Sequence, residues 1–322
     1  MNTVNNSTKA EIRLIEVSDA ESGQRIDNYL MKHLKGVPRS MIYRLLRKGS
    51  VRVNKKRKKP DYRIEAGDIV KIPPIRTAES TNIDIPAHQA DKIRQCILYE
   101  DDVLMVLNKP AGLAVHGGSG LAWGLIELVR QTWPEHKSIE LVHRLDRYTS
   151  GCLLLAKTRA ALLDIQQQIQ AHDLHKSYLA VTQGQWPRSE VKVETALRKN
   201  VIQGGERMVM VDPEGKEATS YFRTRQQFST AALCEVEIVT GRTHQIRVHA
   251  ASEGHALAGD QKYGDSEFNK QFKLVGLNRI FLHAHKISLR HPLSNKVMVV
   301  EAPLPVELRS VLHKLETISN DN

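Results

Sequence analysis

From residue 93 onward, strand-like and helix-like patterns follow one another in no regular order. Residues 97–99 and 103–107 flank an acidic turn, which predicts a hairpin. An apolar strand pattern follows at 153–156, and the apolar spacing of 161–169 is that of an amphipathic helix. A doubly wound parallel sheet needs strands and helices in strict alternation. The order therefore predicts an α+β domain over residues 93–315, built on a mixed, largely antiparallel sheet.

The segment before this domain is short and strongly basic. Residues 26–34 and 39–48 have helical apolar spacing, and the apolar side of the second helix lies opposite its Arg and Lys residues. Between Arg39 and Lys59 the chain has ten Lys or Arg and no acid. A charged run is often only a solvated face, but cations gathered on one helix side and in the next turn favour contact with nucleic-acid phosphates. The expected contacts are Arg39, Arg44, Arg47, Lys48, Arg52, Lys55 and Lys56.

Several short motifs lie within this basic segment. They are Arg25-Ile26-Asp27, Arg39-Ser40, Ile42-Tyr43-Arg44-Leu45-Leu46, Val51-Arg52-Val53-Asn54 and Gly67-Asp68. Through them, residues 20–75 resemble the S4 RNA-binding domain. The resemblance implies docking on structured RNA through its shape and backbone, because side chains cannot read the narrow major groove of A-form RNA. On either side, residues 1–19 are expected to be a flexible N-terminus and residues 76–92 a linker.

The charge balance favours one class of partner. The 322 residues include 47 Lys and Arg against 36 Asp and Glu, a formal net charge of +11. Neutralising phosphates releases counterions, so a nucleic acid is the expected partner. Cys96, Cys152 and Cys234 are odd in number and far apart, which favours a reducing cytoplasm over a disulfide framework or a thiolate zinc site. No apolar run has the length of a signal-peptide core or a membrane helix, so no membrane partner is expected.

One carboxylate is placed where it could do chemistry. Asp146 stands between Arg144 and Arg147, just ahead of the apolar run 153–155. A carboxylate on a loop at the edge of a buried strand, with cations close by, would stay ionised and could act as a nucleophile. The plainer interpretation is a loop aspartate that caps a backbone amide or pairs with Arg144.

Three further segments bear on this choice. In chain order the four are Asn108-Lys109-Pro110-Ala111-Gly112, then His143-Arg144-Leu145-Asp146 with Thr149-Ser150-Gly151, then Lys176-Ser177-Tyr178-Leu179-Ala180, and finally Thr240-Gly241-Arg242-Thr243-His244-Gln245-Ile246-Arg247. Their order and spacing resemble the RNA pseudouridine synthases of the large-subunit ribosomal RNA type, across nearly all of residues 90–305. That family turns uridine into its C-glycoside isomer by cutting the C1′–N1 bond, turning the base and rejoining it through C5.

The resemblance implies a role for five residues. Asp146 would attack C1′ or C6, or stabilise charge at C1′ while the base is detached. Tyr178 would lie against the uracil and help remove the C5 proton, and Arg247 would pair with Asp146. Arg144 would fill the space of an extruded base, and Leu282 would lie under the uracil. The plainer interpretations are a core tyrosine, a surface helix arginine, a phosphate-binding arginine and a core leucine.

No cofactor and no metal are expected, because the isomerisation is neither redox nor phosphoryl chemistry. The histidines at 244, 249, 255, 283 and 285 lack a neighbouring acid or thiolate at ligand spacing and are expected to be structural or to contact phosphates. The implied partner is 23S rRNA or a pre-ribosomal particle, bound by a monomer. Two alternatives stay open, a non-catalytic ribosome assembly factor and an N-glycosidase, which would need a second carboxylate. Residues 316–322 are expected to be a frayed tail.

Overall fold

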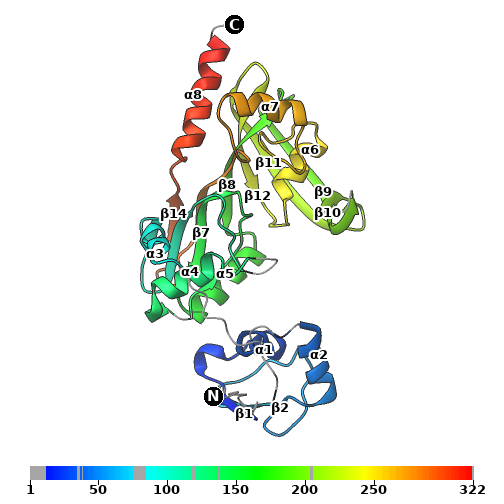
Figure 1. Ribbon diagram of the computed structural model, residues 1–322, viewed down its shortest axis with the longest axis vertical. Coiled ribbons are helices and arrows are strands. Elements are labelled where there is room, and N and C mark those ends of the chain that lie inside the picture. The colour runs from blue at the N-terminus through cyan, green and yellow to red at the C-terminus, as the bar shows by residue number, and fades with distance from the viewer. Residues whose placement is uncertain are drawn as a thin grey trace, which may run out of the picture. The chain divides into compact units, whose positions relative to one another are not determined.

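The computed structural model describes residues 12–34, 37, 39–74, 85–117, 121–136, 138–203 and 206–320 (Figure 1). The chain divides into two compact units, residues 1–84 and residues 85–322. Among the described residues, no helix has both the length and the apolar character needed to cross a membrane.

The N-terminal unit is a small three-stranded antiparallel sheet with two helices. Periodic apolar residues explain the helices, since Ile26 and Leu30 from the first and Ile42 and Leu46 from the second meet in one core. The buried Asp27 carboxylate ties the helices together, because it accepts a hydrogen bond from the Tyr43 hydroxyl at 2.7 Å. The elements are β1 (Arg13–Glu16), η1 (Asp19–Glu21), α1 (Ile26–His33), α2 (Arg39–Lys48), β2 (Arg52–Val53) and β3 (Ile69–Ile72), with sheet order β1-β3-β2.

The C-terminal unit is built on one 11-stranded sheet in the order β10-β9-β11-β12-β8-β13-β7-β5-β4, with β14 beside β13 and β6 beside β7. Among the strand pairings of the described residues, only that of β7 with β13 is parallel, which confirms the predicted α+β fold with a mixed, largely antiparallel sheet. The elements are α3 (Ala87–Arg94), β4 (Ile97–Glu100), β5 (Leu104–Lys109), α4 (Leu125–Thr132), η2 (Pro134–His136), β6 (Glu140–Leu141), β7 (Ser150–Ala156), α5 (Arg159–Gln170), β8 (His175–Gln183), β9 (Glu190–Gln203), β10 (Glu206–Val211), β11 (Lys216–Gln227), β12 (Ala231–Ile238), α6 (Gln245–Ser252), α7 (Ser266–Leu274), β13 (Leu282–Arg290), β14 (Val297–Glu301) and α8 (Val306–Asn320).

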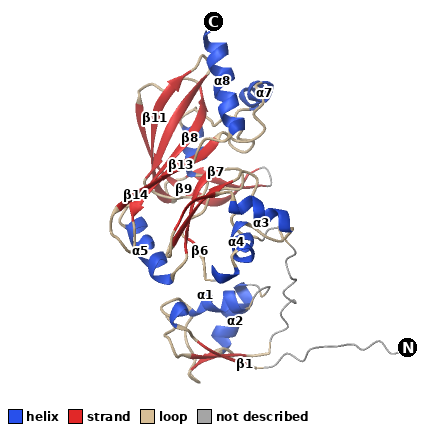
Figure 2. Ribbon diagram, turned by 90° about the vertical axis from the view of Figure 1, so that its left-hand side faces the viewer, coloured by secondary structure: helices blue, strands red, loops and turns tan. Residues whose placement is uncertain are grey.

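Two apolar layers enclose the centre of this sheet. Along β7, Leu153 and Leu155 face the core that contains α4, while Leu154 faces the core that contains α5. Figure 2 shows α4 and α5 on opposite sides of these strands. Every residue of β7 is buried, which explains why the sequence there is a continuous apolar run and not an alternating one.

A glycine makes the parallel pairing possible. Gly151 has φ 107°, and a Cβ at this position would lie 2.2 Å from the carbonyl oxygen of Ala284 on β13. Its neighbour Ser150 hydrogen-bonds His283 of β13 at 2.9 Å. The backbones of β7 and β13 therefore approach closely just after the Asp146 loop, which brings this loop next to the start of β13.

The structure differs from the sequence expectations at the edges of the units. Residues 13–16, expected in a flexible N-terminus, form β1 because β3 offers an antiparallel partner. Residues 87–92, expected in the linker, belong to α3, whose Ile93 is buried in the same core as α4. Residues 75–84 of the expected linker lie outside the described residues. Residues 316–320 continue α8.

Replacing Gly151 with Ala should destabilise the C-terminal unit by more than the backbone strain alone. The control is Gly254→Ala, since Gly254 also has positive φ, at 79°, but a Cβ there would have no atom within 4 Å. We expect a cost of about 1–2 kcal/mol for the control and several kcal/mol for Gly151→Ala. Urea unfolding followed by fluorescence reports on this unit, because Trp123, Trp133 and Trp186 all lie in it. Equal losses would contradict the close contact with Ala284.

Candidate active site

Three neighbouring strands bring the predicted residues together. In the order β8-β13-β7, Leu282 lies opposite Ala180 of β8, and His283 lies opposite Ser150 of β7 (Figure 2). Tyr178 is two residues before Ala180 on β8, and Asp146 is four residues before Ser150. Arg247 lies in the first turn of α6. A cavity of about 510 Å³ is lined by all five of the predicted site residues, Arg144, Asp146, Tyr178, Arg247 and Leu282.

The Arg247 guanidinium lies between two carboxylates. It makes two hydrogen bonds of 2.7 Å to the buried Asp260, through Nε and Nη2, and its Nη1 lies 3.4 Å from Oδ2 of Asp146. Burial would lower the pKa of Arg247, but the hydrogen bonds and charge of Asp260 raise it. From the sequence we expected one carboxylate partner, Asp146. Asp260 was missed because it is 13 residues away with no motif that joins it to Arg247.

His244 also lies beside Asp146, although the sequence analysis assigned it no role in the site. Its Nε2 lies 3.7 Å from Oδ2 of Asp146, and its Nδ1 hydrogen-bonds the Tyr263 hydroxyl at 2.8 Å. Burial lowers the pKa of His244, and the charge of Asp146 opposes this. The backbone of His244 is left-handed, with φ 53°, which turns the chain directly before α6. The Tyr263 ring also lies against Arg247, 4.9 Å from the guanidinium carbon.

Tyr178 presents a protonated phenol in this site. Its side chain is buried, and burial together with the negative charge of Asp146 raises the pKa of its hydroxyl well above the ordinary value. Leu282 is also buried and adds an apolar wall to the cavity. Arg144, by contrast, is exposed at the cavity rim. The site thus combines one ionisable carboxylate, a phenol, an apolar wall and guanidinium groups.

A fully buried lysine holds the loop that carries Asp146. The Lys109 ammonium, at the end of β5, donates to the carbonyl oxygens of Pro110 and Leu113 at 2.9 Å and of Arg147 at 3.1 Å. Burial lowers the pKa of Lys109 to about 7, while the charge of Asp146 acts in the other direction. The motif that contains Lys109 was noticed in the sequence, but its function as a tie between two loops depends on contacts 38 residues apart.

The histidines are used as internal hydrogen-bonding groups. His143 accepts from the Leu154 backbone N–H at 3.1 Å, and His249 and His283 bond to Ser220 and Ser150. His255 and His285 bond to the backbone carbonyls of Gln183 and Ala302. Within the part of the chain that the structure describes, no three His, Cys, Asp or Glu residues are grouped as metal ligands would be.

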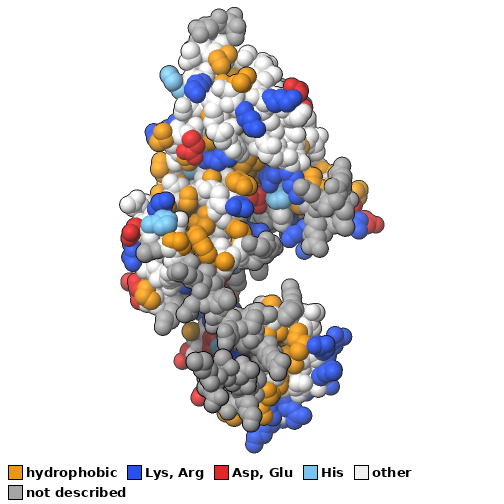
Figure 3. All heavy atoms as spheres, in the orientation of Figure 1, with side chains coloured by type: hydrophobic (Ala, Val, Ile, Leu, Met, Phe, Trp, Pro, Cys, Tyr) orange, Lys and Arg blue, Asp and Glu red, His pale blue; other side chains and the backbone are white. Residues whose placement is uncertain are grey.

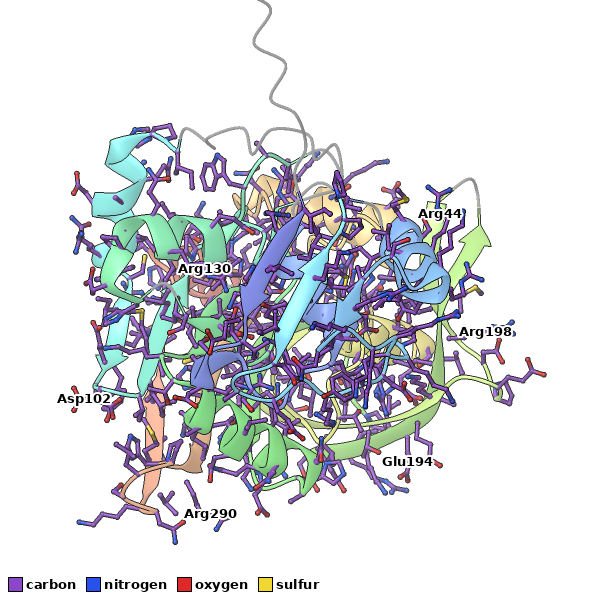
Figure 4. All side chains as sticks on the ribbon, turned by 90° about the horizontal axis from the view of Figure 1, so that it is seen from below. Arg44, Asp102, Arg130, Glu194, Arg198 and Arg290 are labelled. Carbon is purple, nitrogen blue, oxygen red and sulfur yellow. The ribbon has the colours of Figure 1, made fainter. Side chains whose placement is uncertain are left out.

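The N-terminal unit has a separate basic surface. Arg44, Arg47, Lys48, Arg52, Lys55 and Lys56 are all exposed, whereas the side chain of Arg39 lies outside the described residues. Figure 3 shows Lys and Arg gathered on the side of this unit where α2 lies in Figure 1, and Figure 4 labels Arg44 on that helix. Lys55 and Lys56 lie in the tight turn after β2, where Asn54 and Lys55 adopt positive φ values of 48° and 65°.

Comparison with known proteins gives the class. A family model described as RNA pseudouridylate synthase matches residues 103–252, and an S4 domain model matches residues 24–70. Curated members of this family are about half identical to the chain over nearly its whole length. The chain therefore belongs to the RNA pseudouridylate synthase family and carries an N-terminal S4 domain. Membership of an enzyme family decides against the non-catalytic assembly factor.

Three relatives carry the same name, Ribosomal large subunit pseudouridine synthase C. The protein of Yersinia pestis is 50% identical over 304 residues, covering 94% of this chain and 95% of that protein. The protein of Escherichia coli K12 is 49% identical over 308 residues, covering 94% and 97%. The protein of Haemophilus influenzae is 48% identical over 309 residues, covering 95% and 96%.

Solved structures support the fold. Human RNA Pseudouridylate Synthase Domain Containing 4 matches with a TM-score of 0.60 at 23% identity, covering 71% of this chain and 96% of that one. Human RNA Pseudouridylate Synthase Domain Containing 1 matches with a TM-score of 0.56 at 22% identity, covering 70% and 94%. At such low identity these matches bear on the fold alone.

Removing Asp260 should destabilise the protein far more than removing Asp146. Asp260→Ala would leave Arg247, whose side chain is only 14% exposed, without its two short hydrogen bonds, at a cost of about 3–5 kcal/mol. Asp146→Ala removes the 3.4 Å contact with Arg247 and the 3.7 Å contact with His244 from a carboxylate that is 25% exposed, so we expect less than about 1 kcal/mol. The measurement is the free energy of unfolding in urea by tryptophan fluorescence. A larger loss in Asp146→Ala would show that Asp260 is not the structural partner.

Acid should destabilise this unit through its buried histidines. Burial lowers the pKa of His143 to about 3, and of His249 and His283 to about 4. Below pH 6.5 the unfolded chain therefore binds protons that the folded chain does not, and stability is lost as the pH falls from 6.5 towards 4. Each such histidine contributes about 1.4 kcal/mol per pH unit in this window.

The test compares the slope of unfolding free energy against pH, between pH 6 and 4.5, in the wild type and two variants. His143→Gln keeps an acceptor for the Leu154 N–H but removes the titrating group, so its slope should be smaller by about one proton. His313→Gln is the matched control, because it makes the same change at a side chain that is 82% exposed. If both variants keep the wild-type slope, His143 does not stay neutral in the folded protein.

Proposed function

We propose that this protein converts specific uridines of large-subunit ribosomal RNA to pseudouridine, with Asp146 as its catalytic carboxylate. The observation that carries the proposal is the meeting of Asp146, Tyr178 and Arg247 around one cavity. The reaction breaks the C1′–N1 bond, forms a C1′–C5 bond, removes a proton from C5 and leaves one on N1. It is redox-neutral and transfers no group to water, so we propose that it needs no cofactor and no metal.

Asp146 acts at C1′ or C6 of the uridine, or stabilises charge at C1′ while the base is detached. Two features support its role. Arg247 and His244 both lie near its Oδ2 atom, at 3.4 and 3.7 Å, so positive charge and a polar ring face one oxygen of the carboxylate. Because Asp260 already occupies the short hydrogen bonds of Arg247, the Asp146 carboxylate is only loosely held by this cation and keeps an oxygen for the substrate.

The remaining predicted residues are assigned around the base. We assign Tyr178 to the face of the uracil, where its hydroxyl helps to remove the C5 proton and passes its own proton to a base. Leu282 packs under the ring. A stacked uridine cannot reach this cavity, so the base is flipped out of its helix, and the exposed planar guanidinium of Arg144 fills the vacated space.

Substrate choice is assigned to the N-terminal unit. The S4 domain and its exposed basic surface, made of Arg44, Arg47, Lys48, Arg52, Lys55 and Lys56, dock on structured RNA, and Arg39 is included on the basis of the sequence. The names of the half-identical relatives support large-subunit rRNA, free or in a pre-ribosomal particle, as the substrate. We further propose a cytoplasmic monomer, since ribosomal RNA is modified where ribosomes assemble.

Replacing Asp146 with Asn should abolish turnover and preserve RNA binding. The substitution keeps the volume of the side chain but removes the nucleophile, so we expect a rate loss of at least about a thousandfold with unchanged RNA affinity. The control is Asp102→Asn, the same change at an exposed carboxylate labelled in Figure 4, outside the cavity. Tritium release from C5-labelled uridine in large-subunit rRNA measures turnover, and filter binding measures affinity.

The products decide between the remaining alternatives. Chromatography of digested RNA should show pseudouridine, whereas free uracil and abasic sites would indicate an N-glycosidase. Undiminished tritium release by Asp146→Asn would overturn the assignment of this carboxylate.

A further inference from the structure

A second cavity meets the first at Asp146. It has a volume of about 880 Å³ and extends over the other side of the Asp146 loop, towards Asp260 and Arg279. Arg144, Asp146 and Arg247 line both cavities. The proposed chemistry places the flipped uracil beside Tyr178 and Leu282, which line only the first. The second cavity therefore has no occupant in the proposed reaction, although its size lies within the roughly 300–1,000 Å³ of ligand sites.

An exposed aromatic ring borders this second cavity. Tyr148, two residues after Asp146, is 52% exposed, and in the described part of the chain it is the only aromatic among the large apolar side chains that are exposed. Tyr178, in contrast, is buried. An open aromatic face beside a catalytic loop is the surface on which single-stranded bases stack, because every base has a flat π-face to offer.

The backbone that carries this ring is held in place by hydrogen bonds. Arg279 donates to the Tyr148 carbonyl oxygen at 3.3 Å, and the side chain of Arg147 donates to the Gly112 carbonyl oxygen at 2.9 Å. Lys109 holds the Arg147 carbonyl oxygen from below the same loop. The Arg147 guanidinium also lies over the Tyr148 ring, 5.4 Å from its centre. Tyr148 therefore lies on the same fixed loop as Asp146. The backbone of Tyr148 is held at a constant distance from the backbone of Asp146.

The charges around the cavity suit a phosphate. Its lining includes five cationic side chains, Arg144, Arg147, Arg247, Lys262 and Arg279, against two carboxylates, Asp146 and Asp260. Asp260 is already neutralised by its paired hydrogen bonds with Arg247, and Arg279 is paired with Glu307, at 3.0 Å outside the cavity, which leaves Arg144, Arg147 and Lys262 against Asp146. The cavity therefore keeps an excess of positive charge beside an aromatic face, which is the combination that binds a nucleotide through both its base and its phosphate.

We propose that the second cavity receives the nucleotide next to the target uridine, with its base stacked on Tyr148 and its phosphate against the cationic wall. This inference rests on the proposed function, since it takes the flipped uridine to occupy the first cavity. One dinucleotide step then spans both cavities, with Asp146 at their junction. The flipped uridine is held by its neighbour as well as by its own contacts, and the enzyme gains affinity for RNA whose adjacent nucleotide also leaves the stack.

The test compares Tyr148→Ala, Tyr148→Leu and Tyr148→Phe with the wild type on transcribed large-subunit rRNA. Loss of one stacked base should raise KM and Kd by roughly 5- to 100-fold in the Ala variant. Leu, which is apolar but not aromatic, should resemble Ala, and Phe should resemble the wild type. The single-turnover rate at saturating RNA should stay within about twofold in all three, because Tyr148 positions RNA and does not take part in the chemistry.

A second readout reports the stacking itself. RNA carrying 2-aminopurine at the nucleotide on either side of the target should, at one of the two positions, be less fluorescent when bound to the wild type or Tyr148→Phe than when bound to Tyr148→Ala, because only the first two offer a ring that quenches the base. Leu274→Ala, at a leucine that is 88% exposed and outside the second cavity, is the matched control and should match the wild type.

The two levels of the inference fail in different ways. Unchanged KM and unchanged quenching in Tyr148→Ala would overturn the nucleotide site alone. An equal loss in Tyr148→Phe would overturn stacking as the cause. No pseudouridine from the wild-type protein would overturn the proposed function, and the nucleotide site with it.

Discussion

The ion pair between Arg247 and Asp260 is the interaction on which the site depends. Asp260 is buried and the Arg247 side chain is only 14% exposed, and a guanidinium with so little access to water is tolerated only when its donors are matched in the right geometry. Asp260 provides this match with two short hydrogen bonds, so Arg247 cannot turn to form a second tight pair. The weaker contact with Asp146 follows from this constraint. It leaves that carboxylate close to the cation but not fully occupied, as the reaction proposed for Asp146 requires.

The surrounding fold supplies rigidity from two directions. β7 is buried on both faces, so the strand that follows the Asp146 loop cannot move without disrupting both apolar layers. The loop itself is fixed by ammonium and guanidinium groups that bind backbone carbonyls, Lys109 on one side and Arg279 on the other. Because these cations bind backbone carbonyls, they do not occupy the side chains of the loop. Asp146 and Tyr148 can therefore both line a cavity although the backbone that carries them is fixed.

Much of the fold was predictable because it depends on local patterns. The helices at 39–48 and 161–169 and the hairpin around residues 100–103 were visible as apolar periodicity, and the irregular order of elements indicated a mixed sheet. The boundaries were less predictable. β1 exists only because β3 provides hydrogen bonds, and α3 is stabilised by packing on α4, so neither could be recognised from its own residues.

By itself, the sequence determined the candidate chemical groups, since a carboxylate, a phenol and a guanidinium at Asp146, Tyr178 and Arg247 lie within recognisable motifs. Only the tertiary structure decided which residues contact these three side chains. The contacts of Asp260, His244 and Lys109 with this site join residues that are far apart in the sequence. Hydrogen bonds and charge interactions act over a few ångströms in space, so they produce no periodic pattern in the sequence from which they could be predicted. The second cavity, with Tyr148 on its rim, has the same origin.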